Sequence, residues 1–246
     1  MNIAGLEKCS FVDYPGRLAA VFFVPGCNWN CFYCHNQTLL RKEAPLPRVK
    51  PEEAFDLLRS RRGLLDGVVV TGGEPTLQAG LRDFIVQVRG LGYAVKLDTN
   101  GSRPLVLGAL LADGLLDYVA MDLKAPMAKY EAVCGAPVDH RDLNESIDLI
   151  MSSGIEYEFR TTVVPQLTHA DVAAMARRIR GARRYVLQQY RNPALFAEQE
   201  QLHDPRLDVP PHETGWPSHV MEEISQYVAE CQTRGFQRSL EATSAA

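Results

Sequence analysis

Apolar, β-branched runs alternate with amphipathic segments of helical period along most of the 246-residue chain. The apolar runs predict six strands, over residues 17–26, 67–73, 93–101, 115–124, 155–165 and 184–190. The amphipathic segments predict six helices, over residues 51–63, 77–92, 104–114, 143–154, 169–181 and about 218–230. Strict alternation implies a parallel sheet with right-handed crossovers. We therefore expect an α/β fold, either a doubly wound sheet or a single-domain incomplete (β/α)6 barrel.

Polar and glycine-rich motifs follow the carboxyl ends of these predicted strands. They are "PGCNWNC", "TGGEPT", "DTNG", "DLK", "VVPQ" and "QQYRN". In both candidate architectures the active site lies at the carboxyl ends of the strands. The sequence therefore predicts one functional site, assembled from six strand ends at one rim.

Composition narrows the class of protein. The formal charge of −4 argues against a nucleic-acid partner. The N-terminal segment lacks the apolar core of a signal peptide, and no apolar run is long enough to span a bilayer. We expect a cytoplasmic protein with no membrane contact, folded over residues 1–235 and ending in a flexible tail, 236–246.

Three cysteines, Cys27, Cys31 and Cys34, fall within eight residues. Thiolates at such spacings on one loop can converge on a soft metal centre. Six cysteines in a chain of this length do not make a disulfide scaffold. The remaining three are isolated and are interpreted as small buried hydrophobes: Cys9, Cys134 and Cys231.

The kind of metal centre has competing interpretations. Structural zinc needs four ligands, and no second Cys/His pair at finger spacing is present, so His35 would have to fold back onto the same ion. Three unrelated buried thiols are the other alternative. The favoured interpretation is a [4Fe–4S] cluster that three cysteines hold and that keeps one iron position open.

The motif Cys27-x3-Cys31-x2-Cys34, with Tyr33 before the last cysteine, resembles the signature of the radical S-adenosylmethionine (SAM) enzymes. The segments "FVDYPGRLAAVFFVPGCNWNCFYCHN", "TGGEPTLQ", "LDTNG", "MDLK" and "VVP" are similar, in order and spacing, to those of the glycyl-radical-enzyme activating enzymes. The likeness covers roughly residues 5 to 192 and is strong through Lys124. Compact length favours the branch that activates anaerobic ribonucleoside-triphosphate reductase.

The resemblance implies a reaction and its partners. SAM would chelate the open iron, accept an electron and break into methionine and a 5′-deoxyadenosyl radical, which would remove hydrogen from a glycine of a glycyl radical enzyme. A flavodoxin- or ferredoxin-like protein would donate the electron, and the activator would be a monomer. No cysteine lies between Cys34 and Gly72, so we expect one cluster only.

The resemblance also assigns residues around SAM. Gly72 and Gly73 would face its ammonium group, and Glu74 would supply negative charge there. Asn36 would contact SAM, and Tyr33 would lie near the adenine. Ordinary polar turns explain the glycine segment and Asn36 equally well.

For the charged residues at the later strand ends, the resemblance implies a role in binding SAM, and a purely structural role is the alternative. Lys124 would bind the SAM carboxylate and take part in catalysis, and Asp98, Thr99 and Asp122 would bind SAM or a monovalent cation. An Asx turn at Asp98 and a salt bridge between Asp122 and Lys124 are the structural alternatives.

Two arginines complete the predicted site. Arg160 would reach into the barrel, unless an internal ion pair with Glu158 or Asp122 holds it. Arg191 stands where the pyruvate formate-lyase activator is expected to have a histidine, so its contact with SAM stays open.

Two other functions remain in view: a compact radical SAM enzyme acting on a small molecule, as in deazaguanine formation, and a non-catalytic zinc-binding module. The sequence also leaves open whether the Pro- and His-rich segment 204–219 shields the site or only connects elements.

Overall fold

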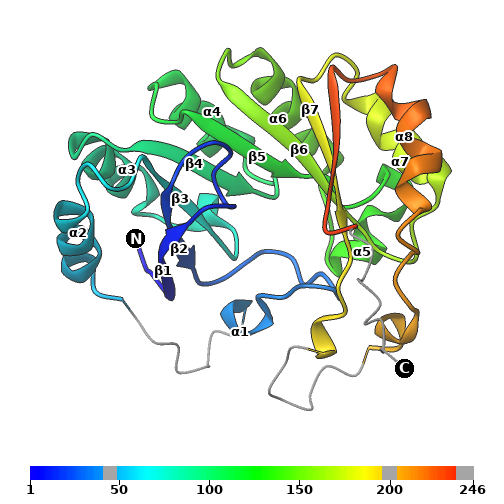
Figure 1. The fold of residues 1–246 in the computed structure, drawn as a ribbon, viewed down its shortest axis with the longest axis horizontal. Helices are drawn as coiled ribbons and strands as arrows, with labels where there is room; N and C mark the ends of the chain where they lie inside the picture. The colour runs from blue at the N-terminus through cyan, green and yellow to red at the C-terminus, as the bar shows by residue number, and fades with distance from the viewer. Residues whose placement is uncertain (41–48, 196–203, 237–246) are drawn as a thin grey trace, which may run out of the picture.

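The computed structural model describes residues 1–40, 49–195 and 204–236, so the predicted tail lies outside it except for Phe236. One eight-stranded sheet carries the strands side by side in chain order (Figure 1). The strands are β1 Gly5–Ser10, β2 Ala19–Val24, β3 Gly67–Gly72, β4 Ala94–Thr99, β5 Tyr118–Asp122, β6 Glu156–Val163, β7 Arg184–Gln189 and β8 Glu230–Arg234.

Helices connect the strands from β2 onward. They are α1 Gln37–Leu40, α2 Pro51–Ser60, α3 Leu81–Gly90, α4 Pro104–Ala112, α5 Tyr130–Cys134, α6 His140–Ser152, α7 His169–Arg178 and α8 Trp216–Ser225. Several begin with the expected signals, such as the capping box in which Thr168 and Asp171 bond each other's backbone at the start of α7. Within the described ranges, no helix is both long and apolar enough to cross a membrane.

The sheet is an open partial barrel, which confirms the predicted fold class. Strands β2 to β8 pair in parallel, β1 pairs antiparallel to β2, and β1 and β8 form the two edges. Among the described residues these edges do not pair with each other.

The two edge strands were not predicted. Both "GLEKCS" and "ECQTR" are largely polar, and an edge strand needs less apolar surface because one side faces water. The predicted last helix was therefore too long at its carboxyl end. Helix α8 ends at Ser225, and Glu230 already begins β8.

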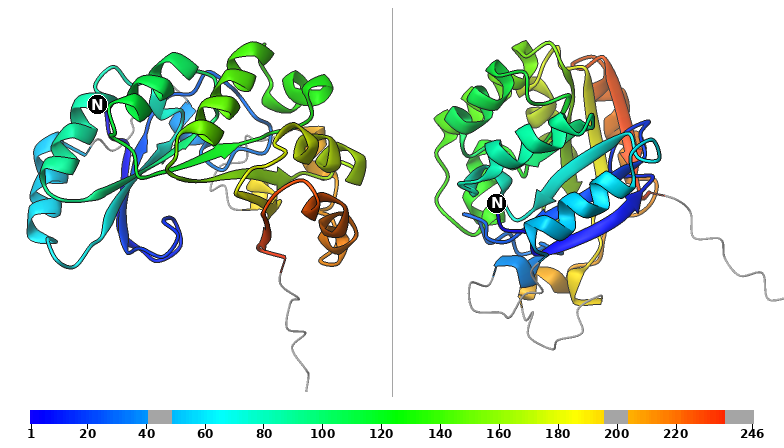
Figure 2. Two further views of the ribbon diagram at one scale, coloured as in Figure 1. Left: turned by 90° about the horizontal axis from the view of Figure 1, so that it is seen from above. Right: turned by 90° about the vertical axis from the view of Figure 1, so that its left-hand side faces the viewer.

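In the described part of the chain, the helices that connect the strands lie on the convex face of the curved sheet, and no helix covers the concave face (Figure 2). Successive strand residues point to opposite faces. On β5, Val119 and Met121 belong to the large core beneath the helices, whereas Tyr118 and Ala120 belong to a smaller cluster on the concave side. Asp122 has the same parity as this second pair, so it too lies on the concave side.

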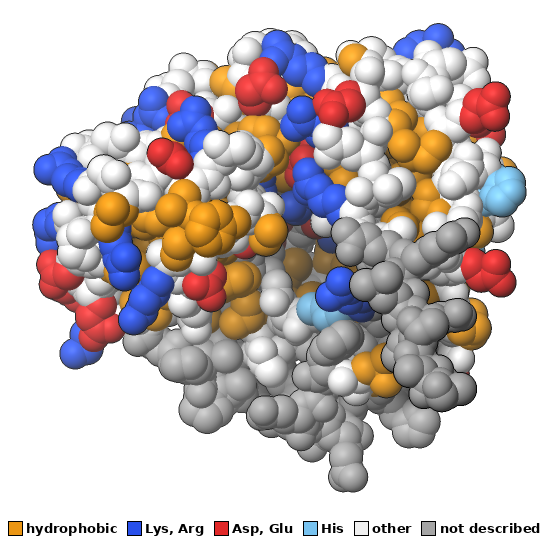
Figure 3. Space-filling model, in the orientation of Figure 1, with side chains coloured by type: hydrophobic (Ala, Val, Ile, Leu, Met, Phe, Trp, Pro, Cys, Tyr) orange, Lys and Arg blue, Asp and Glu red, His pale blue; other side chains and the backbone are white. Residues whose placement is uncertain are grey.

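Charged groups on the concave face are paired. Glu158 is fully buried on β6 and accepts two hydrogen bonds from Arg234, of 2.9 and 2.6 Å, and one from the Tyr118 hydroxyl at 3.1 Å. Arg234 belongs to β8, so this pair links β6 and β8 across β7. In the space-filling view, basic and acidic side chains lie next to one another near the middle of this face (Figure 3).

We predict that Arg234→Ala destabilises the fold, because it leaves the Glu158 carboxylate buried without its cation. The free energy of unfolding should fall by about 2 to 4 kcal/mol, somewhat less than for a wholly buried pair, since the Arg234 side chain is 34% exposed. Urea unfolding followed by tryptophan fluorescence measures the change. Arg183→Ala, which removes a pair whose side chains are 50% and 61% exposed, is the control and should cost under about 1 kcal/mol. Equal losses in the two variants would contradict the assignment.

Candidate active site

A loop after β2 carries the three clustered cysteines over the carboxyl end of the sheet. It leaves the strand at Gly26, whose φ of 81° favours glycine. A backbone bond from Cys34 N–H to the Cys31 carbonyl, 3.0 Å long, closes a turn. All three thiols line one cavity, which has a volume of about 270 Å³.

The thiols differ in how readily they ionise. Burial raises the pKa of Cys27 to about 11, and burial also raises the pKa of Cys34. A hydrogen bond with Cys134 is the main reason that the pKa of Cys31 is lowered to about 7. Cys134 belongs to α5 and is fully buried beside Cys31, but it does not line the cavity. The sequence analysis assigned Cys134 to the core and missed its contact with the cysteine loop.

Within the described part of the chain, no three His, Cys, Asp or Glu side chains gather closely enough to hold a single metal ion. The three clustered thiols share the cavity but are not arranged as ligands of one ion. His35 lines the cavity as a neighbour of Cys34.

The glycine pair at the end of β3 lies against the cysteine loop and lines the same cavity. Gly72 has a φ of 112°, and a Cβ there would lie 2.5 Å from the Val24 nitrogen. A Cβ on Gly73 would lie only 2.0 Å from the Gly26 carbonyl oxygen. Glu74 N–H donates to that same oxygen at 2.9 Å. The two loops can approach this closely because neither glycine carries a side chain.

Asn36 joins the same two loops, since its side-chain amide donates to the Gly72 carbonyl at 3.0 Å. Asn36 also lines the cavity, as predicted for a ligand contact.

Glu74 is buried behind the cavity wall and does not line the cavity. Its Oε1 accepts from the Thr99 hydroxyl at 2.8 Å and from Thr76 through both backbone (3.0 Å) and hydroxyl (2.6 Å), and its Oε2 accepts from Asn100 N–H at 2.7 Å. Burial raises the pKa of this carboxyl, against those bonds. Glu74 therefore acts on the site by holding Thr99 and Asn100, which do line the cavity.

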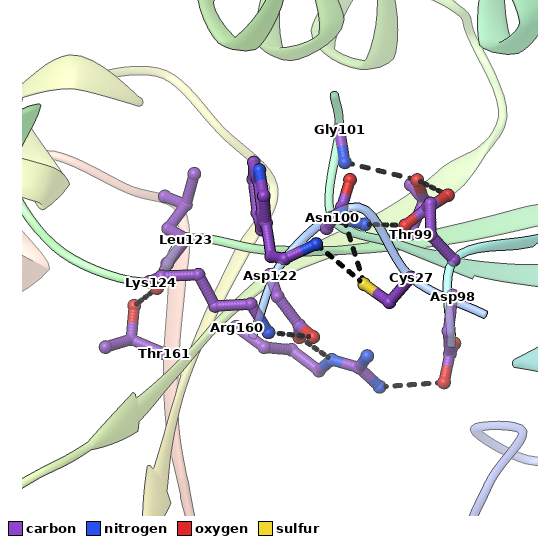
Figure 4. Close-up of polar contacts among 12 residues, drawn as sticks. Cys27, Asp98, Thr99, Asn100, Gly101, Asp122, Leu123, Lys124, Arg160 and Thr161 are labelled. Atoms are coloured by element: carbon purple, nitrogen blue, oxygen red, sulfur yellow. Dashed lines mark hydrogen bonds and ion pairs between the residues drawn. The ribbon is translucent and has the colours of Figure 1, made fainter. Parts of the chain in front are cut away.

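A chain of charges crosses the ends of β4, β5 and β6 (Figure 4). Arg160 donates to Asp98 at 3.2 Å and to Asp122 at 2.9 Å. Lys124 donates to the other Asp122 oxygen at 2.9 Å, and Lys96 pairs with the other Asp98 oxygen. Of these five residues, all except Lys96 line the cavity.

The electrostatics follow from these pairs. Burial would raise the pKa of Asp122, but the positive charges of Arg160 and Lys124 outweigh burial and hold that pKa well below its usual range. Burial would lower the pKa of Lys124, yet Asp122 holds it well above its usual value. Asp122 and Lys124 therefore form the salt bridge that was the structural alternative, and both also line the cavity.

Tyr33 is buried against the cavity, and its hydroxyl has no hydrogen-bond partner among the described residues. The Lys124 ammonium lies 5.9 Å from its ring centroid. A buried hydroxyl without a partner is costly unless a ligand satisfies it.

Arg191 is exposed and does not line the cavity, although its backbone contacts His35. Gln188 occupies the end of β7 on the cavity side instead, in register with Thr162 on β6. The motif "QQYRN" contains Gln188, but only the parity of the strand shows which of its residues faces inward.

The residues that line the cavity fit a metal-containing group that is bound by thiolates. Three thiols line the cavity, and two glycines line it with bare backbone. The charges of Lys124 and Arg160 stand beside two carboxylates, which suits a ligand carrying both charges. The unpartnered Tyr33 hydroxyl gives a further polar group for such a ligand.

Comparisons with known proteins identify a family, several similar sequences and similar folds. The profile described as the radical SAM superfamily matches residues 21–179. A Methanocaldococcus jannaschii protein named as a glycyl-radical enzyme activating enzyme is 32% identical over 206 residues, which are 80% of this chain and 83% of that protein. A Pyrococcus abyssi protein named as a GTP 3′,8-cyclase is 36% identical over 115 residues, 46% of this chain and 36% of the cyclase. Streptococcus suis SuiB, solved with bound S-adenosylmethionine, shares the fold with a TM-score of 0.62 at 13% identity, over 87% of this chain and 52% of SuiB.

We predict that Gly73→Ala opens the seam between the cysteine loop and the β3 end, because its methyl group would meet the Gly26 carbonyl. Relieving such a clash should cost about 1 to 3 kcal/mol of stability and should sharply lower the iron bound after anaerobic reconstitution. Thermal unfolding and iron per chain are the measurements. The control is Gly90→Ala at the end of α3, where nothing lies within 4 Å of the new methyl group. Full iron loading of Gly73→Ala would refute this role.

Proposed function

This chain belongs to the radical SAM superfamily, and from that membership we propose that it is an activating enzyme for a partner glycyl radical enzyme. The family implies a [4Fe–4S] cluster and SAM as its cofactors. The observation that carries the finer proposal is the similarity to the M. jannaschii activating-enzyme relative, because it extends over 83% of that protein.

We assign the cluster to Cys27, Cys31 and Cys34, which line one side of the cavity. The glycine pair and the charged strand ends line the same cavity and would hold SAM beside the cluster. When bound, the cluster and SAM supply reductive cleavage of the sulfonium to methionine and a 5′-deoxyadenosyl radical. The protein's own contribution is to place the ligand, balance its charges and keep water away.

Lys124 is assigned to the SAM carboxylate. The Lys124 side chain lines the cavity and is 16% exposed, and its ammonium donates to Asp122, so it is held in position before a ligand arrives. The carbonyl edge at Gly72–Gly73 would receive the ammonium group. The buried Tyr33 hydroxyl, which has no partner among the described residues, would donate to the adenosine part.

A bound monovalent cation stays a prediction with less support. Asp98 already accepts from Lys96 and Arg160, and Asp122 already accepts from Arg160 and Lys124. A metal cation at either carboxylate would have to displace one of these side chains.

The open concave side supports a macromolecular substrate, since a polypeptide loop needs lateral access that a closed barrel would deny. A flavodoxin- or ferredoxin-like donor would supply one electron for each SAM. The products would be methionine, 5′-deoxyadenosine and a glycyl radical, because the hydrogen comes from the glycine Cα. Anaerobic ribonucleoside-triphosphate reductase is the proposed partner. A monomeric, cytoplasmic protein with no nucleic-acid or membrane partner remains the expectation.

A small-molecule substrate is the second candidate. The 36% identity to the cyclase relative favours it, although this likeness spans only 36% of the cyclase. Both candidates share the cluster and SAM and differ only in what gives up the hydrogen.

We predict that the anaerobically reconstituted protein, with dithionite and SAM, forms 5′-deoxyadenosine, measured by liquid chromatography. Cys31→Ala should reduce the product to the background rate, because the cluster loses one of three ligands. Cys9→Ala is the matched control, since this thiol is exposed on β1. If the wild-type protein yields no more product than Cys31→Ala, the enzymatic proposal fails.

The substrate is tested with the partner present. An electron paramagnetic resonance doublet that arises on the partner, and that its glycine-to-alanine variant abolishes, supports the activating function. If no glycyl radical forms on any glycyl radical enzyme of the same cell while SAM cleavage proceeds, the small-molecule candidate takes its place.

We predict that Lys124→Met weakens SAM binding. A hydrogen bond to a charged group is worth about 1.5 to 3 kcal/mol, so the KM for SAM should rise roughly 10- to 100-fold. Steady-state cleavage kinetics measure it. Lys129→Met removes a lysine paired with Asp171 that does not line the cavity, and should leave KM unchanged. Equal KM values for the two variants would remove Lys124 from the site.

A further inference from the structure

A short segment from the Pro- and His-rich stretch lies against the cysteine loop. Asp204 caps the 3-10 turn Pro205–Asp208, and Arg206 within it places its guanidinium carbon 4.4 Å from the centre of the Phe32 ring. Phe32 sits between Cys31 and Tyr33 and is buried. An arginine at this distance from an aromatic face makes a cation–π contact. Segment 204–208 therefore touches the loop between two of its cysteines.

Arg206 also binds the element that flanks the loop on its other side. Its Nη1 donates to the Ala132 carbonyl of α5 at 2.6 Å. The same helix accepts a bond from the cysteine loop, Asn30 N–H to the Cys134 carbonyl, at 2.8 Å. Gly135 ends α5 with a φ of 65°, and a Cβ there would lie 2.5 Å from the Asn30 carbonyl oxygen. The loop, α5 and segment 204–208 thus meet at Arg206.

The segment is itself held in place from the sheet side. The Gln166 amide, after β6, donates to the Arg206 carbonyl at 3.0 Å. The Asn192 amide, after β7, donates to the Leu207 carbonyl at 2.8 Å, and Leu207 is only 3% exposed. Arg206 is therefore delivered to Phe32 by a fixed backbone.

The Arg206 guanidinium is paired with Asp204 along one edge and lies with one face on Phe32. Asp204 accepts from Nε at 2.9 Å and from Nη2 at 2.6 Å, which leaves one guanidinium face on Phe32. Hydrogen bonds to Asp204 are the main cause of the raised pKa of Arg206. Phe32, on which the guanidinium lies, directly follows Cys31 in the chain, so the charge is delivered next to a proposed cluster ligand.

We propose that Arg206 is a positioning residue for the cluster: it clamps the cysteine loop onto α5 through Phe32, and the Arg206–Asp204 pair sets the reduction potential of the cluster. The inference rests on the proposed cluster at Cys27, Cys31 and Cys34. A cation near thiolate ligands stabilises the more negative, reduced form and so raises the potential, and a nearby anion does the opposite. Nearby charge and solvent exposure are the two properties through which this segment would act.

The test compares three variants in the reconstituted protein. Arg206→Met removes the charge, Arg206→Lys keeps the charge but loses the planar fork, and Asp204→Asn leaves the arginine without its anion. The control is Arg59→Met on α2, which removes a surface arginine paired with Asp56. Two quantities are measured: the midpoint potential, by mediated titration followed by paramagnetic resonance, and the rate at which a chelator removes iron.

Arg206→Met should disfavour reduction by several-fold to about tenfold, which is about 59 mV at the upper limit for one electron. Asp204→Asn should shift the potential in the opposite direction, and Arg206→Lys should stay near the wild-type value. Both arginine variants should lose iron to the chelator several-fold faster than the wild type, because lysine and methionine cannot reproduce the clamp. The control should change neither quantity.

Opposite shifts from the two members of one ion pair cannot arise from loosening alone, so they separate electrostatic tuning from a folding defect. The proposal is overturned if Arg206→Met and Asp204→Asn shift the potential in the same direction or not at all. It is also overturned if Arg206→Met loses iron no faster than Arg59→Met. If Arg206→Met does not fold, an unshifted potential in Asp204→Asn overturns it. A wild-type protein that binds no iron would instead refute the proposed cluster.

Discussion

The charges on the concave face of the sheet have to be paired, and this requirement shapes the rest of the molecule. An incomplete barrel has no opposite wall to neutralise inward-pointing ions, and a buried unpaired charge is strongly destabilising. Arg160 meets the requirement at the rim by bridging Asp98 and Asp122, which come from two neighbouring strands. Arg234 meets it lower on the sheet by binding Glu158. The same pairs keep the inner face polar enough to hold a charged ligand.

Close backbone approach is the second condition for the site. The cysteine loop lies directly on the β3 end, where Gly73 leaves room for the Gly26 carbonyl, and on α5, where Gly135 leaves room for Asn30. Between these two contacts the three thiols are held to one side of a cavity. Glu74 ties the end of β3 to the end of β4, because its carboxylate accepts hydrogen bonds from the Thr99 hydroxyl and from the Asn100 backbone. Because these hydrogen bonds are shared, the position of the residues at one strand end depends on the residues at the next.

Much of this could be predicted from the chain, and the failures have physical causes. The interior strands and most helices have strong apolar periodicity, so the partial barrel was predictable. Strands β1 and β8 were not, because an edge strand with polar residues has no such signal. The cysteines, the glycine pair and the charges at the strand ends were identified from motif and position. Glu74 was expected at the ligand and the contact of Arg191 was left open, and the structure buries Glu74 outside the cavity lining and puts Arg191 on the surface.

The sequence by itself determined the fold class, the clustering of three cysteines on one loop and the rim at which the polar strand ends meet, because each depends on residue type and on spacing within one element. Only the tertiary structure decided that Cys134 lies beside Cys31, that Arg160 joins two strands, that Gln188 faces the cavity and that Arg206 reaches Phe32 from 174 positions along the chain. These contacts join segments far apart in sequence. They depend on how the sheet curves and where each loop is anchored, and periodicity within a single element does not encode that.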